Sequence, residues 1–156
     1  MTPAVALLKR KKIQFRIHEY CHDTAAESFG LEAAEKLGLP PARVFKTLVV
    51  LLSSGDLAVG IIPVSDKLSM KHIAKATGGK KAEMAQPALV ERTTGYVLGG
   101  VSPLGQKKSL QTIIDQSALN WQTIFVSAGK RGLEIELAPG DLKSMLNATF
   151  ANIMQR

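Results

Sequence analysis

Residues 44–63 carry the sequence Val44-Phe-Lys-Thr-Leu-Val-Val-Leu-Leu52, Ser53-Ser-Gly-Asp56 and Leu57-Ala-Val-Gly-Ile-Ile-Pro63. Two apolar runs of strand length flank four residues that favour a tight turn, and this combination predicts a β-hairpin. The first run is apolar at positions that face both sides of a sheet, so we expect both faces of this strand to be buried. Lys46 is the one charged residue in that run.

Short elements with turn-forming residues between them are expected on either side of this hairpin. A first helix is expected at 3–11, capped by Thr2 with Pro3 in its first turn, and a second around 27–37, ending at Gly38. A third is expected from a cap at Asp66 or Ser69 to Ala76. Two more are expected from Pro87 to about 92 and from a cap at Asp141 to about 146. Strands are expected at 13–17, 96–98, 112–114, 123–127 and 133–137, the last two joined by the turn 129–132. Because hairpins dominate, the sequence predicts an α+β fold with a mixed, mostly antiparallel sheet surrounded by helices.

Length and composition predict one soluble domain spanning residues 1–156. Hydrophobic residues make up 46% of the chain and charged residues 21%, as in ordinary globular proteins. A chain of this length can bury a core without disulfides or a structural metal. Cys21 is the only cysteine, and neither a secretory signal nor a membrane-spanning run is present, so we expect a cytoplasmic protein without membrane contact.

The charge is unevenly distributed. The net charge is +7, and the first 82 residues hold 13 of the 20 basic residues but 7 of the 13 acidic ones. The basic residues cluster at 9–12 and at Lys67, Lys71, Lys75, Lys80 and Lys81. Such a surface favours polyanions such as nucleic acids, although it also serves solubility alone.

Two features stand out as candidate sites. Lys46, in its apolar strand, must extend its ammonium to solvent, find a partner or face a polar pocket. The segment Gly99-Gly-Val-Ser-Pro103 allows a close approach of the backbone to a ligand and can direct N–H groups at an oxyanion or phosphate. A strand-end lysine and a tight turn between strands are the structural alternatives.

Other motifs are incomplete. His18, Cys21 and His22 form an H-x-x-C-H cluster without a second ligand pair, so we expect no metal site and no cofactor. In the segment from Gly100 to Ser109, Gln106 separates the second glycine from the lysine that a phosphate-binding P-loop requires. No nucleophile elbow or catalytic triad is recognisable.

Taken together, several segments resemble the YbaK/EbsC family, relatives of the editing (insertion) domain of bacterial prolyl-tRNA synthetase. The glycine- and proline-rich block and the K-T-L strand are specific in combination. The resemblance extends over nearly the whole chain, and its segments are 1–5, 45–48, 81–85, 94–96, 99–108, 126–127 and 129–133. It implies the fold of these editing domains, a partial barrel surrounded by helices, and the activity of a free-standing aminoacyl-tRNA deacylase.

The resemblance also implies the site residues. It makes Lys46 the functional lysine and Gly100–Pro103 the G-x-x-P loop, so Lys46, Gly100 and Ser102 are the expected catalytic residues. The expected substrate-binding residues are Tyr20, Phe29, Thr47, Gly99, Val101, Pro103, Ser127 and Gly129. The family pattern has Asp at position 134 and Gly at 128, where this chain has Glu134 and Ala128. The longer carboxylate leaves Glu134 without an assigned role, and Cys21 has none.

The implied substrate is cysteine mischarged onto proline tRNA. The expected partners are the acceptor end of that tRNA and, transiently, prolyl-tRNA synthetase. The implied mechanism uses the substrate's own thiol to form a thiolactone. Two alternatives stay open: a deacylase for another small residue, such as alanine, using an activated water, and a non-catalytic module that binds tRNA or the synthetase.

Overall fold

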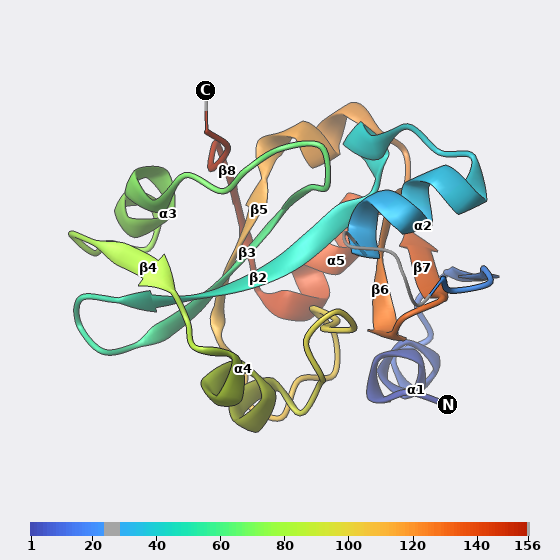
Figure 1. Ribbon diagram of the computed structural model, residues 1–156, viewed down its shortest axis with the longest axis horizontal. Helices are drawn as coiled ribbons and strands as arrows, with labels where there is room; N and C mark the ends of the chain where they lie inside the picture. The colour runs from blue at the N-terminus through green and yellow to red at the C-terminus, as the bar shows by residue number, and fades with distance from the viewer. Residues whose placement is uncertain (24–28, 156) are drawn as a thin grey trace.

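The computed structural model describes residues 1–23 and 29–155 (Figure 1). Its α-helices are α1 (Pro3–Arg10), α2 (Phe29–Leu37), α3 (Met70–Ala76), α4 (Pro87–Thr94) and α5 (Pro139–Leu146), with 3-10 turns at Pro41–Arg43 and Gln116–Asn120. Its strands are β1 (Arg16–Glu19), β2 (Phe45–Leu52), β3 (Leu57–Pro63), β4 (Ala82–Met84), β5 (Gln111–Asp115), β6 (Ile124–Lys130), β7 (Leu133–Leu137) and β8 (Thr149–Ala151). The α+β expectation is confirmed.

The hairpin predicted at 44–63 is the centre of the larger sheet. β2 and β3 pair antiparallel from Phe45↔Pro63 to Leu51↔Leu57, and the sheet order is β4-β2-β3-β5-β8. The β3–β5 and β5–β8 pairs are parallel, which makes this sheet mixed. Figure 1 shows the hairpin crossing the molecule, with α3 and β4 at one end and the smaller sheet with α1 and α2 at the other.

The smaller sheet is antiparallel and has the order β1-β7-β6. A parallel bridge between Val44 and Phe125 joins it to the start of β2. Side chains of both sheets, among them Phe45, Ile61 and Ile135, fill one large core. A second core, which includes Val50, Ile62 and Ile73, lies on the other face of β2 and β3. Both faces of β2 are therefore buried, as its sequence predicts.

β2 is incompletely paired at the end nearest the small sheet. β3 pairs with it from Phe45 to Leu51, whereas β4 pairs only with Val50–Leu52. The first half of β2 thus has β3 along one edge, and its other edge faces the space between the two sheets. This arrangement places Lys46 and Thr47 beside a pocket.

Several expected elements differ in the structure. Residues 96–98 form no strand, because the left-handed Gly95 ends α4 and the Tyr96 amide then bonds to Thr94 Oγ1. The strand expected at 13–17 begins only at Arg16, where pairing with β7 starts. α5 begins at Pro139, so Asp141 lies in its first turn and is not its cap. The start expected at residue 27 for the second helix lies outside the described residues. β4 and β8, of three residues each, were missed.

Candidate active site

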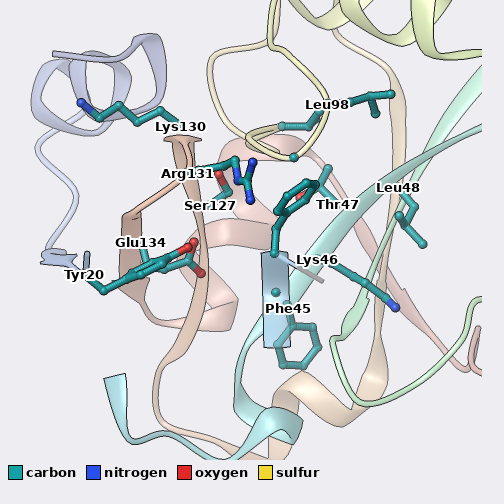
Figure 2. Close-up of a pocket in the computed structure, with 14 residues that line it drawn as sticks. Tyr20, Phe45, Lys46, Thr47, Leu48, Leu98, Ser127, Lys130, Arg131 and Glu134 are labelled. Atoms are coloured by element: carbon teal, nitrogen blue, oxygen red, sulfur yellow. The ribbon is translucent and has the colours of Figure 1, made fainter. Parts of the chain in front are cut away.

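A pocket of about 440 Å³ opens between the two sheets, beside α2 (Figure 2). β2 contributes Phe45, Lys46, Thr47 and Leu48, and the small sheet contributes Ser127, Lys130, Arg131 and Glu134. The remaining lining residues are Tyr20, Phe29, Gly30, Leu98, Gly99 and Val101. Seven of the eleven residues expected at the site line this pocket: Tyr20, Phe29, Lys46, Thr47, Gly99, Val101 and Ser127.

Lys46 is half-buried at one side of the pocket. Its neighbours along β2 are apolar, and burial is the main cause that lowers the pKa of its ammonium; Asp66 opposes this shift and Lys67 adds to it. Figure 2 shows Lys46 and Glu134 on opposite sides of the site, with the Lys46 ammonium pointing away from Glu134. The ammonium therefore carries a desolvation cost that no ion pair among the described residues offsets.

The loop expected to contact the substrate turns around Gly99. This residue has a φ of +92°, and a Cβ there would lie 2.7 Å from the Phe29 ring, so the loop needs glycine to pack against α2. The Gly100 amide donates to Val97 O, at 2.9 Å. In the described structure the amides of Gly99, Val101 and Ser102 have no acceptor. Of these three residues, Gly99 and Val101 line the pocket, so their N–H groups are the ones available to an oxyanion.

Gly100, Ser102, Pro103 and Gly129 are not among the residues that line the pocket, and their expected roles stay predictions. Ser102 is fully buried and its Oγ accepts a hydrogen bond from the Leu104 amide, so it shapes the loop from behind. Pro103 lines a separate cavity on the other side of the loop. At Gly129 a Cβ would lie 2.5 Å from the Tyr96 ring, so this glycine serves packing. The sequence marks the loop, but it does not indicate which side of each residue faces the ligand.

The pocket contains buried polar groups without partners, two of them on residues to which the sequence assigned no role, Arg131 and Glu134. Glu134 is buried with no hydrogen-bond partner in the described part of the chain, and this burial raises the pKa of its carboxyl to about 8. Thr47 Oγ1 and Arg131 Nε and Nη2 are likewise buried without a partner there. Because buried polar groups are nearly always paired, this concentration in one pocket indicates a polar ligand.

The histidines lie elsewhere. His18 Nε2 contacts Glu136 Oε1 and His22 Nδ1 contacts Glu32 Oε1, each at 2.8 Å. Cys21 is exposed and does not line the pocket. Within residues 1–23 and 29–155 no cluster of His, Cys, Asp or Glu is suited to a metal ion. No described helix is both long and apolar enough to span a membrane.

Glu134→Gln is expected to change the pH dependence of stability. The folded chain keeps this proton up to about pH 8, whereas the unfolded chain releases it near the ordinary value of 4.5. The folded state therefore binds the extra proton between these values, and stability falls as pH rises through this window. Thermal unfolding should show the variant gaining stability over the parent as pH rises. The control is Glu83→Gln, at an exposed position. A stability difference between Glu134→Gln and the parent that stays constant from pH 4.5 to pH 8 would contradict the raised pKa of Glu134.

The fold and pocket define an α+β domain with a ligand site between two sheets. The fold matches the crystal structure of a candidate trans-editing enzyme for prolyl-tRNA synthetase, with a TM-score of 0.86, 21% identity, and coverage of 99% of this chain and 96% of that one. Residues 25–145 match the aminoacyl-tRNA editing domain. The chain belongs to the aminoacyl-tRNA editing domain family, which confirms the resemblance.

Two relatives connect this family to proline tRNA. EbsC of Enterococcus faecalis, named as a candidate Cys-tRNA(Pro)/Cys-tRNA(Cys) deacylase, is 40% identical over 155 residues, covering 97% of this chain and 92% of that protein. A proline–tRNA ligase of Acidithiobacillus ferrooxidans is 30% identical over 88 residues. That match covers 56% of this chain but 15% of the ligase, so it relates this chain to one part of a larger enzyme.

Proposed function

We propose that residues 1–156 form a deacylase that hydrolyses cysteine mischarged onto proline tRNA. The observation that carries this proposal is the 40% identity to EbsC over nearly the full length of both chains. The substrate is the acceptor end of the tRNA, and prolyl-tRNA synthetase is the proposed transient partner, since a proline–tRNA ligase contains a segment related to this chain. The reaction then takes place in the cytoplasm, where tRNA is charged.

The composition of the pocket favours attack by the substrate itself. No cysteine or histidine lines it, and Ser127 Oγ already accepts a hydrogen bond from the Gly129 amide at 3.1 Å. A serine or threonine without an adjacent base is a weak nucleophile. A cysteinyl ester brings its own thiol, which has a free pKa of about 8.5. The thiol loses its proton and the thiolate attacks the ester carbonyl, which forms a C–S bond. The bond between the carbonyl carbon and the ribose oxygen then breaks, and that oxygen takes up a proton. The product is a thiolactone, which water later opens.

The protein's contribution is orientation and charge stabilisation. We assign the unpaired amides of Gly99 and Val101, two residues that line the pocket, to the ester oxygen, where each donor contributes about 3 kcal/mol to the transition state. Lys46 holds the ribose or backbone phosphate near the carbonyl. Its half-buried ammonium interacts more strongly with an anion than a solvated one would. Positioning the thiol against the carbonyl supplies several kcal/mol more.

A second hydrolytic site has a physical reason. Cysteine and proline are similar in size, and a small apolar pocket distinguishes such amino acids by only about 1–3 kcal/mol. A synthetase that charges proline therefore also charges some cysteine. A separate pocket whose chemistry depends on the thiol removes that error without attacking the correct product.

The function is tested by comparing hydrolysis of proline tRNA charged with cysteine, alanine or proline. The proposal predicts rapid release of cysteine and little release of the other two. Preferential release of alanine would favour the water-activating deacylase. Binding of all three without hydrolysis would favour the non-catalytic module.

Charge reversal on α3 should weaken tRNA binding. Lys67, Lys71 and Lys75 are exposed and four residues apart, and Lys67 is close enough to influence the Lys46 ammonium. The double variant Lys71→Glu/Lys75→Glu should bind more weakly and flatten the plot of log affinity against log salt by about 1–2. Filter binding across salt concentrations measures both. The control is the double variant Arg92→Glu/Lys143→Glu, which makes the same change in charge at exposed positions of α4 and α5. If both double variants weaken tRNA binding equally, the lysines of α3 make no specific contact with tRNA and serve solubility alone.

A further inference from the structure

Arg131 lies in the pocket with part of its hydrogen-bonding capacity unused. Its Nε and Nη2 are buried and have no partner in the described part of the chain. These two nitrogens form one edge of the guanidinium, the edge that donates two parallel hydrogen bonds to a carboxylate or a phosphate. A buried charged donor without a partner is costly, so its retention inside a pocket indicates an anionic ligand.

The position of the guanidinium is fixed by its surroundings. Its Cζ lies 3.7 Å from the centroid of the Phe29 ring, a cation–π contact that holds the group against α2. The following residue, Gly132, accepts a hydrogen bond from the Tyr20 amide at 3.0 Å, which holds the turn against the segment leading out of β1. Arg131 is therefore held at the wall of the pocket, and a shift of its guanidinium brings the buried Nε–Nη2 edge to a ligand.

Arg131 differs from the other two cations of the pocket. In Figure 2 the Lys130 and Lys46 side chains extend away to opposite sides, whereas the Arg131 guanidinium lies among the lining residues. Glu134 does not neutralise it, since the structure gives no ion pair between them and the buried carboxyl keeps its proton at neutral pH. The interior of the pocket is thus positively charged when empty.

We propose that Arg131 binds the 5′ phosphate of the terminal nucleotide of the tRNA, with Nε and Nη2 donating to two phosphate oxygens. This inference rests on the proposed function. An aminoacyl ester has no carboxylate, so the phosphate attached to its own nucleoside is the permanent anion nearest to the reacting carbonyl. The Phe29 ring beneath the guanidinium and the apolar side chains of Leu98 and Val101 accommodate the adjoining nucleoside. Lys46 is then left for the ribose end of the ester.

The test uses two small substrates that differ only in that phosphate: adenosine and 5′-AMP, each esterified with cysteine on the ribose 3′ oxygen. The parent protein should cleave the phosphorylated ester with a kcat/KM about tenfold or more above that of the other, the size of a charged hydrogen-bond pair. Arg131→Gln should remove this preference by slowing only the phosphorylated ester. Arg131→Lys, which keeps the charge but loses the paired donors, should retain a small part of it. Arg92→Gln, on the exposed face of α4, is the control.

Equal slowing of both esters by Arg131→Gln would overturn the proposal and assign Arg131 to the reacting carbonyl. No slowing of either would also overturn it. If the parent cleaves neither ester, the proposed function is at fault, and direct binding of AMP and adenosine decides the inference: Arg131→Gln must weaken AMP alone. Thermal unfolding of both variants checks that they fold, and Arg131→Lys retains the cation–π contact with Phe29 in a reduced form.

Discussion

Lys46→Met is expected to lower kcat/KM for Cys-charged proline tRNA by roughly 10²-fold or more, the usual effect of removing one pre-organised charged donor from a reacting centre. Methionine keeps the apolar stem and removes the ammonium. Because burial already disfavours that charge in the folded chain, the variant should be as stable as the parent or more stable. Single-turnover deacylation and thermal unfolding measure the two effects.

Two further variants separate charge from geometry. Lys46→Arg keeps a cation on β2 and should retain part of the activity. Val49→Ala, at a buried position of the same strand, should lower stability by roughly 1–3 kcal/mol while changing kcat/KM little. Loss of stability with retained activity in Lys46→Met would show that the lysine is structural.

The sequence predicted the hairpin at 44–63 because its signal is local: two apolar runs, a four-residue turn and no competing helix pattern. The same reasoning failed at residues 96–98, where the side chains favour a strand but Gly95 and Thr94 turn the chain. β8 pairs in parallel with β5, and the chain between them includes β6, β7 and α5. No short-range pattern predicts such a pairing, because it depends on how distant elements pack.

For the candidate site, the resemblance indicated segments more reliably than side chains. Lys46 and Thr47 both line the pocket. They are consecutive residues of β2, so their side chains leave opposite faces of the strand, and the pocket lies at the edge of β2 that β4 does not cover. Gly100 and Ser102 belong to the same loop but do not line the pocket: Gly100 packs against the backbone of Gly129 and Lys130, and the buried Ser102 Oγ accepts a hydrogen bond from the Leu104 amide. A loop has no regular period, so its sequence does not predict which residues face inward.

Arg131 was missed, and Glu134 was left without a role because the family pattern has Asp at its position. Each is an ordinary charged residue in sequence, at a turn and at the start of a strand that alternates between polar and apolar side chains. In the folded chain Arg131 contacts Phe29 of α2, and Glu134 of β7 is buried. Charged side chains at a turn or at a strand end are normally solvated, and the signal that distinguishes these two is their lack of hydrogen-bond partners in the described part of the chain.

Replacing the sulfur of the substrate by oxygen should abolish most of the rate without changing any protein atom. Ser-charged proline tRNA is nearly identical in size to the Cys-charged form, so we expect the two to bind with similar affinity. A serine hydroxyl is far less ionised than a thiol near neutral pH, which leaves little of the attacking anion. Deacylation of the serine ester should therefore be slower by several orders of magnitude, and the rate for the cysteine ester should rise with pH as its thiol ionises.

The first product distinguishes this mechanism from hydrolysis by an activated water. Attack by the substrate thiol releases a thiolactone, which hydroxylamine captures as the hydroxamate of cysteine before water opens the ring. Attack by water releases free cysteine directly and is insensitive to the exchange of sulfur for oxygen. A control without protein measures how much ester hydroxylamine cleaves by itself. Comparable rates for the two esters, with free cysteine and no hydroxamate above that control, would exclude the thiol as nucleophile and leave a water molecule in its place.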